Sequence, residues 1–146
     1  MTKDEVLAIL EELVESNRSG VFVSVGEDGF PDARWMTAAF LRGEHRDIYA
    51  VTSPSDKKVT QVSANPNVLW LLERKGHREV FRVKARATVV ENPALLSQVL
   101  ETLGGSLNLF WQVHGSVDEF AVLECNITSV EYQRPLDAYT EVFSWE

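Results

Sequence analysis

The stretch TSPSDKKVTQVSANP, residues 52–66, places three hydroxyl side chains and two adjacent lysines within its first seven residues. Ser55 is a suitable N-cap for a helix over 56–64, which the Asn-Pro pair would end. The first turn of a helix carries a partial positive charge, so Lys57 and Lys58 there are each unfavourable by about a few tenths of a kcal/mol unless an anion compensates. The stretch therefore predicts either a solvated helix start or a socket for an anion such as a phosphate, lined by hydroxyls and free backbone N–H groups.

A second candidate for this anion lies in ARWMTAA, residues 33–39. On a strand, Arg34 and Met36 share one face, and Trp35 and Thr37 share the other. If this strand lies beside the strand expected over 47–52, the guanidinium could bind the same phosphate with two hydrogen bonds. The alternative is an edge-strand arginine in a surface ion pair.

The composition is that of an ordinary globular protein, with 45% hydrophobic and 25% charged residues among 146. This length predicts a single domain over residues 1–146. There is no run of eighteen apolar residues, and the acidic, amphipathic N-terminus is unlike a signal peptide, so we expect a soluble, cytoplasmic protein with no membrane partner. The formal net charge of -8 disfavours nucleic acid as a partner.

The hydrophobic pattern alternates mostly with a period of two, and turn signals divide it into short elements. It predicts helices over 3–16, over 56–64 and from Pro93 after an Asn92 cap, and strands over 20–26, 31–41, 47–52, 67–73, 79–91 and 120–132. Residues 107–120 are ambiguous between a short helix and an aromatic loop, and 135–146 form a tail. Six strands connected by hairpins indicate a mainly β protein, an antiparallel barrel with peripheral helices.

Most catalytic signatures are missing from the sequence. His45, His77 and His114 lie far apart without metal-ligand spacing, so no metal site is expected. Neither a Rossmann nor a P-loop glycine motif is present. Cys125, the single cysteine, alternates with apolar residues on a strand, which favours a buried core thiol over a nucleophile and allows no internal disulfide.

Three motifs, in order along the chain, resemble those of the pyridoxamine 5'-phosphate oxidase-like, FMN-binding split-barrel superfamily. They are GFPDARWM (29–36), VTSPSDKKVTQVSANPNV (51–68) and VKARATVVENPALL (83–96). The resemblance covers about residues 5–103 and is closest to the short general stress protein branch. It implies a six-stranded split barrel that forms a homodimer, with one FMN in each of two clefts between the subunits; FAD is the alternative cofactor.

The resemblance also implies which residues bind the flavin. Those that match the family's contacts fall into three groups: Arg34, Lys57 and Lys58 for the phosphate; Trp35, Met36, Thr37, Val51, Thr52 and Ser53 for the isoalloxazine ring; and Trp111, which could stack on the ring from the partner subunit or serve as a core aromatic. His114 is either a proton donor near the flavin or a surface histidine.

The sequence also departs from the family pattern. Ala39 stands where larger members place a lysine on the phosphate-binding strand, and Ala85 replaces the glycine of the third motif. The 79–91 strand lacks the glutamine that full oxidases present to the flavin. The arginine-rich C-terminal motif that holds pyridoxal phosphate is reduced to Arg134, so the resemblance does not extend to a true pyridoxamine phosphate oxidase.

Three interpretations follow. The first is a flavin-dependent oxidoreductase of unknown substrate, which would use a small-molecule electron donor or acceptor. The second is a non-catalytic, stress-related flavin-binding protein. The third is a split-barrel scaffold that has lost its cofactor. No residue is identified as catalytic.

Overall fold

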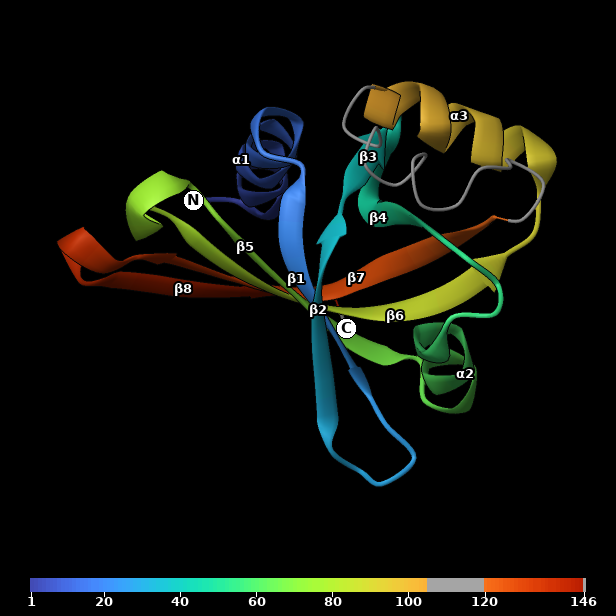
Figure 1. The fold of residues 1–146 in the computed structure, drawn as a ribbon. Helices are drawn as coiled ribbons and strands as arrows, with labels where there is room; N and C mark the ends of the chain where they lie inside the picture. The colour runs from blue at the N-terminus through green and yellow to red at the C-terminus, as the bar shows by residue number, and fades with distance from the viewer. Residues whose placement is uncertain (105–119, 146) are drawn as a thin grey trace.

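The computed structural model describes residues 1–104 and 120–145, and within them the chain is mainly β, as predicted (Figure 1). The elements in chain order are α1 (Lys3–Ser16), β1 (Ser19–Val25), β2 (Pro31–Thr37), β3 (Ala39–Leu41), β4 (Glu44–Thr52), α2 (Lys57–Ala64), β5 (Asn67–Glu73), the single-turn helix η1 (Lys75–His77), β6 (Val80–Val90), α3 (Pro93–Leu103), β7 (Ala121–Arg134), the single-turn helix η4 (Pro135–Asp137) and β8 (Tyr139–Ser144).

The strands of the described residues form one antiparallel sheet in the order β2-β1-β5-β6-β7-β4-β3, with β8 paired to β7. β2 and β3 are consecutive in the chain, separated only by Ala38, yet they lie at opposite ends of this order. The sheet must therefore curl to bring its two ends together, and it forms the half-barrel seen in Figure 1. This is the split-barrel architecture expected from the sequence.

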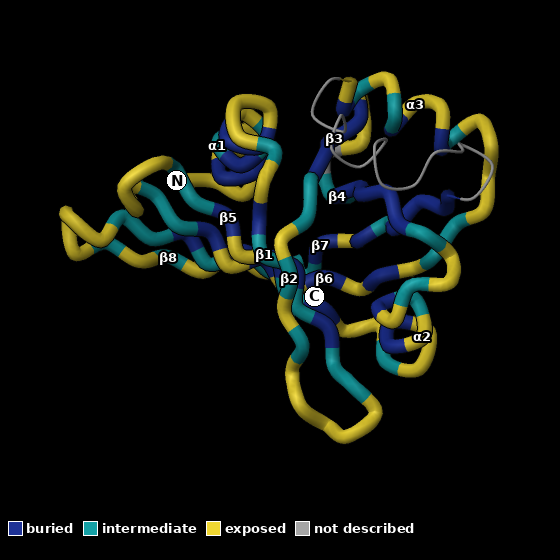
Figure 2. Tube along the Cα trace, viewed as in Figure 1, coloured by how far each residue is buried: buried dark blue, intermediate teal, exposed yellow. Residues whose placement is uncertain are grey.

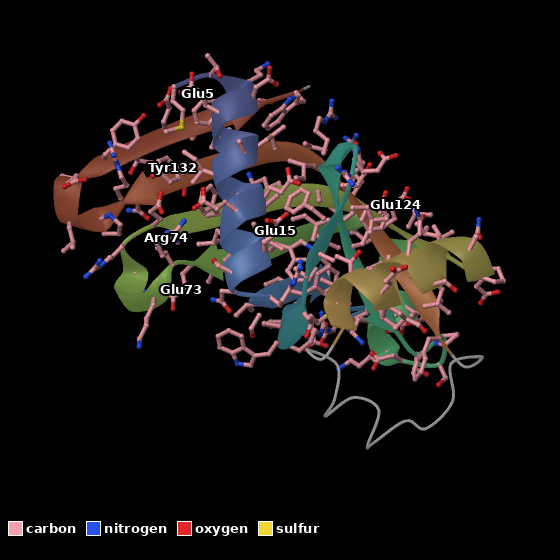
Figure 3. The ribbon with its side chains drawn as sticks, turned by 90° about the horizontal axis from the view of Figure 1, so that it is seen from above. Glu5, Glu15, Glu73, Arg74, Glu124 and Tyr132 are labelled. Atoms are coloured by element: carbon pink, nitrogen blue, oxygen red, sulfur yellow. The ribbon has the colours of Figure 1, made fainter. Side chains whose placement is uncertain are left out.

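Alternating burial along the strands builds the interior. On β6, Phe81 and Val83 are fully buried, whereas Arg82 and Lys84 between them are exposed, as the alternation predicted. The larger of two hydrophobic cores, called the first core below, lies between α1 and the sheet. α1 lies across the sheet (Figure 3), and its buried face, which includes Val6, Leu10 and Val14, covers this core. The ring of the fully buried Trp70 packs edge-on against that of Phe22, with the centroids 5.1 Å apart.

A second, smaller core lies under α3. There Leu96 and Val99 of the helix pack against Tyr49 of β4 and Val122 of β7. The buried segments that carry these residues are dark in Figure 2. Val51, near the end of β4, belongs to this second core, so the core extends to the point where the chain leaves β4 toward α2.

Two sequence-based expectations are corrected by the structure. The strand expected over 31–41 is two strands, because Ala38 and Ala39 are both fully buried and face the first and the second core respectively. The expected C-terminal tail instead contains β8, paired with β7. The described residues therefore contain eight strands rather than six.

The other elements agree with the sequence pattern, and β5 has the predicted bounds. Among the described residues, no helix is long and apolar enough to cross a membrane.

Candidate functional site

The polar residues singled out in the sequence gather around α2. This helix follows β4 and precedes β5, and its buried residues Lys58, Gln61 and Val62 recur at helical spacing. Two of these three are polar, which is unusual for the inner face of a short helix. The inner face of α2 is therefore a polar contact with the barrel rather than an apolar one.

Asp32 is the centre of the first polar cluster, which joins the β1–β2 hairpin to α2. Its Oδ2 accepts a hydrogen bond from Gln61 Nε2 at 3.0 Å and forms ion pairs with Lys57 Nζ at 3.0 Å and Arg34 Nη2 at 3.4 Å. Arg34 also donates from Nη1 to Ser24 Oγ at 2.8 Å. The strand that carries Arg34 is thus fixed to the first turns of α2 through side chains alone.

Lys58 is the centre of a second cluster at the end of β4. Its ammonium donates to Thr52 Oγ1 at 3.1 Å and pairs with Asp56 Oδ1 at 3.0 Å. Only 10% of the Lys58 side chain is exposed, against 76% for Lys57. The two adjacent lysines therefore point to different surroundings, Lys58 into the protein and Lys57 toward solvent.

The pKa values of both carboxylates are lowered. For Asp32, hydrogen bonds from Gln61 and Lys57 lower the pKa. For Asp56, burial alone would raise the pKa, but hydrogen bonds from the backbone N–H and the ammonium of Lys58 outweigh burial and lower it. Both groups are therefore ionised at neutral pH.

The clusters nonetheless hold more positive than negative charge. Arg34, Lys57 and Lys58 face Asp32 and Asp56, so three cations meet two carboxylates. This local excess occurs in a chain whose formal net charge is -8. The guanidinium and the two ammonium groups are donors of the kind that bind phosphate, whereas the Thr52 hydroxyl accepts from Lys58 and donates to the Ser53 carbonyl at 3.3 Å.

The remaining sequence-predicted residues are placed as follows. Trp35 points away from Arg34 and is 73% exposed, while Met36 packs against the first core. Val51 belongs to the second core, Ser53 Oγ lies 3.0 Å from Ser55 Oγ, and Thr37 is half-buried. Trp111 and His114 lie outside the described residues.

The Arg34 strand comes close to the 47–52 strand but is not its neighbour in the sheet. β2 pairs with β1, whereas β4 pairs with β3 and β7. Arg34 approaches the candidate anion site through α2 instead, because its guanidinium donates to Gln61 Oε1 at 3.3 Å.

The expected N-cap of the helix after β4 is also wrong: the N-cap of α2 is Asp56, one residue after the expected Ser55. The backbone N–H of Asp56 bonds to the Ser53 carbonyl in a turn that moves the helix start along by one residue. The Asp56 carboxylate accepts the Lys58 N–H at 3.0 Å, so one backbone donor expected for an anion already has a protein partner.

Sequence reasoning missed Asp32, Asp56, Gln61 and Ser24. The signal for Asp32 was its position two residues before Arg34, on the same face of the strand. Gln61 stands one helical turn after Lys57 and three residues after Lys58. Ser24 carried no signal, because only the antiparallel pairing of β1 with β2 brings it near Arg34.

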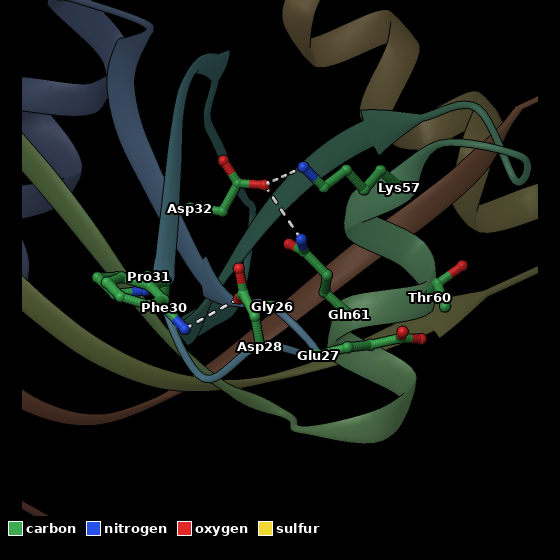
Figure 4. Close-up of a pocket in the computed structure, with 9 residues that line it drawn as sticks. All are labelled: Gly26, Glu27, Asp28, Phe30, Pro31, Asp32, Lys57, Thr60 and Gln61. Atoms are coloured by element: carbon green, nitrogen blue, oxygen red, sulfur yellow. Dashed lines mark hydrogen bonds and ion pairs between the residues drawn. The ribbon is translucent and has the colours of Figure 1, made fainter.

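A pocket of about 570 Å³ opens beside these clusters, between the β1–β2 turn and α2 (Figure 4). The residues that line it are Gly26, Glu27, Asp28, Phe30, Pro31, Asp32, Lys57, Thr60 and Gln61. Its rim thus includes Lys57 and Asp32 of the first cluster.

Cys125 is fully buried within the first core, as predicted. Burial raises the pKa of its thiol to about 12, so the thiolate needed for nucleophilic chemistry is not formed at neutral pH. Within residues 1–104 and 120–145, no group of three or more His, Cys, Asp or Glu side chains is arranged to hold a metal ion.

The sequence of residues 7–134 matches the family model described as pyridoxamine 5'-phosphate oxidase. A comparison with curated protein sequences finds no match.

Solved structures that share the fold of this chain include the following three. General stress protein 26 from Bacillus anthracis is 22% identical, with a TM-score of 0.74 over 95% of this chain and 99% of that one. A Clostridium acetobutylicum protein related to general stress protein 26 is 14% identical, with a TM-score of 0.77 over 99% and 97%. A pyridoxamine 5'-phosphate oxidase-related, FMN binding protein from Nostoc punctiforme is 12% identical, with a TM-score of 0.65 over 100% and 98%.

Proposed function

The chain belongs to the pyridoxamine 5'-phosphate oxidase family, and we propose that it binds FMN through the polar clusters around α2. In this proposal Arg34 and Lys58 hold the phosphate, with Lys57 at the rim and the Thr52 hydroxyl beside Lys58. The FMN binding named for the Nostoc punctiforme relative supports the choice of cofactor.

The buried ammonium of Lys58 is the observation that carries the proposal. Removing an ion from water costs several kcal/mol unless partners compensate, by order of magnitude. Here the compensation within the chain is Asp56, whose carboxylate is itself 42% exposed, and the neutral Thr52 hydroxyl. A phosphate at this position would supply the negative charge and the acceptor oxygens that the ammonium and the guanidinium can both use.

We propose that the protein with its flavin bound is an oxidoreductase, since a bound flavin supplies electron and hydride transfer. The chain's own residues would fix the phosphate and orient the ring through β2 and the end of β4.

The proposal excludes pyridoxamine phosphate oxidation itself. Arg134 pairs with Asp137 at 3.7 Å and lies 4.6 Å from the ring centroid of Tyr139. These contacts support a structural role for Arg134 rather than the binding of a second phosphate ligand.

A second candidate is a flavin-binding protein without turnover. The reduction of the arginine-rich substrate motif to Arg134 favours it. Ala39 instead supports the third interpretation, a scaffold that has lost its cofactor, because the residue is fully buried in the second core and contributes no cation to the site. The site therefore has fewer positive charges than the family pattern provides.

We also propose a homodimer that forms across the outer face of β2 and its neighbours. Trp35 is 73% exposed there, and it pairs across the strands with Val21, which in turn pairs with Leu71. These three side chains form an apolar row across β2, β1 and β5, and β2 also carries Arg34, so a second copy would cover the row and close the site. Light scattering should report a dimer that Trp35→Glu dissociates. Val142→Glu is the matched control, since Val142 is 61% exposed on β8. A monomeric parent protein would refute the dimer.

The test of flavin binding is the visible absorbance spectrum of the purified protein, followed by titration with FMN under fluorescence detection. Flavin bands, or quenching that saturates at one FMN per chain, are expected. Bleaching of the bound flavin by NADH or NADPH, with recovery in air, would support an oxidoreductase, and a stable colour would support the second candidate. Neither bands nor quenching would overturn the proposal.

A further inference from the structure

A second pocket lies at the end of β2 that is farther from the first polar cluster. Its volume is about 550 Å³, in the range of small-molecule sites. The last turns of α1 and α3, the start of β1 and the end of β2 contribute to its wall. The described residues that line it are Glu15, Ser16, Asn17, Arg18, Ser19, Thr37, Thr102 and Leu103. Seven of these eight are polar, so the pocket suits a hydrophilic molecule.

Arg18 supplies the positive charge of this pocket. It is half-buried, and its guanidinium makes no hydrogen bond or ion pair with any residue in 1–104 or 120–145. Its Nη1 is enclosed by protein, whereas Nε and Nη2 are not, so these two nitrogens are open to a ligand. A partly desolvated guanidinium with unused donors favours an anionic partner, and its planar fork matches a carboxylate.

Two hydroxyls at the helix ends supply hydrogen-bond acceptors. Ser16 Oγ donates to the Leu13 carbonyl at 3.0 Å, and Thr102 Oγ1 donates to the Gln98 carbonyl at 2.9 Å. Each hydroxyl has only one proton and uses it within its own helix. Toward a ligand in the pocket, both oxygens can therefore only accept a hydrogen bond.

Glu15 adds a negative charge to the same pocket. It is exposed near the C-terminal end of α1 (Figure 3), and no ion pair joins it to Arg18. The C-terminal ends of α1 and α3 contribute further partial negative charge, as helix ends do. The carboxylate, the helix ends and the accepting hydroxyls together favour a cation with N–H donors, and they disfavour a ligand that carries only negative charge.

We propose that this pocket binds a free α-amino acid. Its carboxylate would pair with the guanidinium of Arg18, and its ammonium would bind Glu15 and the hydroxyl oxygens of Ser16 and Thr102. A ligand with both charges fits a pocket whose own guanidinium and carboxylate are not paired with each other. Because the lining is almost wholly polar, a hydrophilic side chain such as that of glutamine suits it better than an apolar one.

The experiment is isothermal titration calorimetry of the protein as purified, with L-glutamine as the ligand. Two analogues test the two charges separately: glutaramate lacks the α-ammonium, and γ-aminobutyramide lacks the carboxylate. L-glutamine should bind saturably. Glutaramate and γ-aminobutyramide should each bind about tenfold more weakly or worse, because each loses one charge-assisted contact.

Three variants test the residues. Arg18→Met should weaken L-glutamine binding by about tenfold or more, because it removes the charge and keeps an unbranched side chain. Glu15→Gln should weaken binding by about fivefold or less, because the carboxylate is exposed. Glu12→Gln is the matched control, since Glu12 is exposed one turn earlier on α1, away from the pocket lining, and should change nothing.

The inference concerns binding alone and does not depend on the proposed flavin site. Because Thr37 is also among the residues expected beside the isoalloxazine ring, FMN affinity is measured in the same variants and should be unchanged. The inference is overturned if L-glutamine does not bind saturably, if both analogues bind as tightly as L-glutamine, or if Arg18→Met binds as the Glu12→Gln control does. Glutamine binding without FMN binding would support this site and refute only the proposed function. Thermal denaturation of each variant would show that it remains folded.

Discussion

Replacement of Lys58 with methionine should weaken FMN binding far more than the same replacement at Lys57. Methionine keeps an unbranched side chain of similar length and removes the charge. The Lys58 ammonium is buried between Thr52 and Asp56, while the Lys57 ammonium is largely in solvent beside Asp32. The two variants therefore change the same charge in two different surroundings.

The difference in binding free energy can be worked from this burial. A hydrogen bond to a charged group is typically worth about 1.5–3 kcal/mol, so Lys58→Met should raise the dissociation constant of FMN by about 10- to 150-fold. An exposed ion pair is worth about 0.2–1 kcal/mol, which gives an increase of about fivefold or less for Lys57→Met. Lys58→Met should still fold, because Asp56 keeps its hydrogen bond to the backbone N–H of residue 58.

The assay is quenching of flavin fluorescence, with FMN and with riboflavin, which lacks the phosphate. Riboflavin affinity should be nearly the same in the parent protein and in both variants. The reasoning would be refuted if Lys58→Met weakened FMN and riboflavin alike, which would make Lys58 structural. Equal losses of FMN affinity in the two variants would show that burial of Lys58 is irrelevant to binding.

Three further predictions concern parts of the molecule outside the flavin site. Trp70→Ala should lower the free energy of unfolding by about 3–5 kcal/mol in urea denaturation, because it empties the centre of the first core; a loss below about 1 kcal/mol would contradict this packing. The pKa of Glu79 is lowered, because hydrogen bonds from Tyr132 and Arg74 outweigh the effect of burial. Its contribution to stability is therefore present at neutral pH and lost as the pH falls below the ordinary carboxyl range, so Glu79→Gln should destabilise the protein at neutral pH and converge with the parent in acid. A constant difference at all pH values would contradict it. Cys125 should resist thiol reagents in the native protein and react once urea unfolds it; rapid reaction in the native state would show that the thiol is accessible.

Much of the local structure could be predicted from the sequence. Alternation over Phe81–Val89 identified the buried face of β6, and Asn92 with Pro93 identified the start of α3. These signals are local, since a strand or a helix start depends on residues close in sequence. The C-terminal β8 was missed because its exposed Val142 and polar neighbours carry weak alternation, and only pairing with β7 makes it a strand.

The sequence by itself determined the mainly β class, the family motifs and the group of cations Arg34, Lys57 and Lys58. Tertiary structure alone decided how these cations are used. It joined Arg34 to Lys57 through Asp32, buried Lys58 beside Thr52, and left Lys57 at the rim of a pocket. The physical reason is that the charge of a side chain follows from its residue type, which the sequence states directly. Its burial and its partners depend instead on which distant segments the curled sheet brings to the same place.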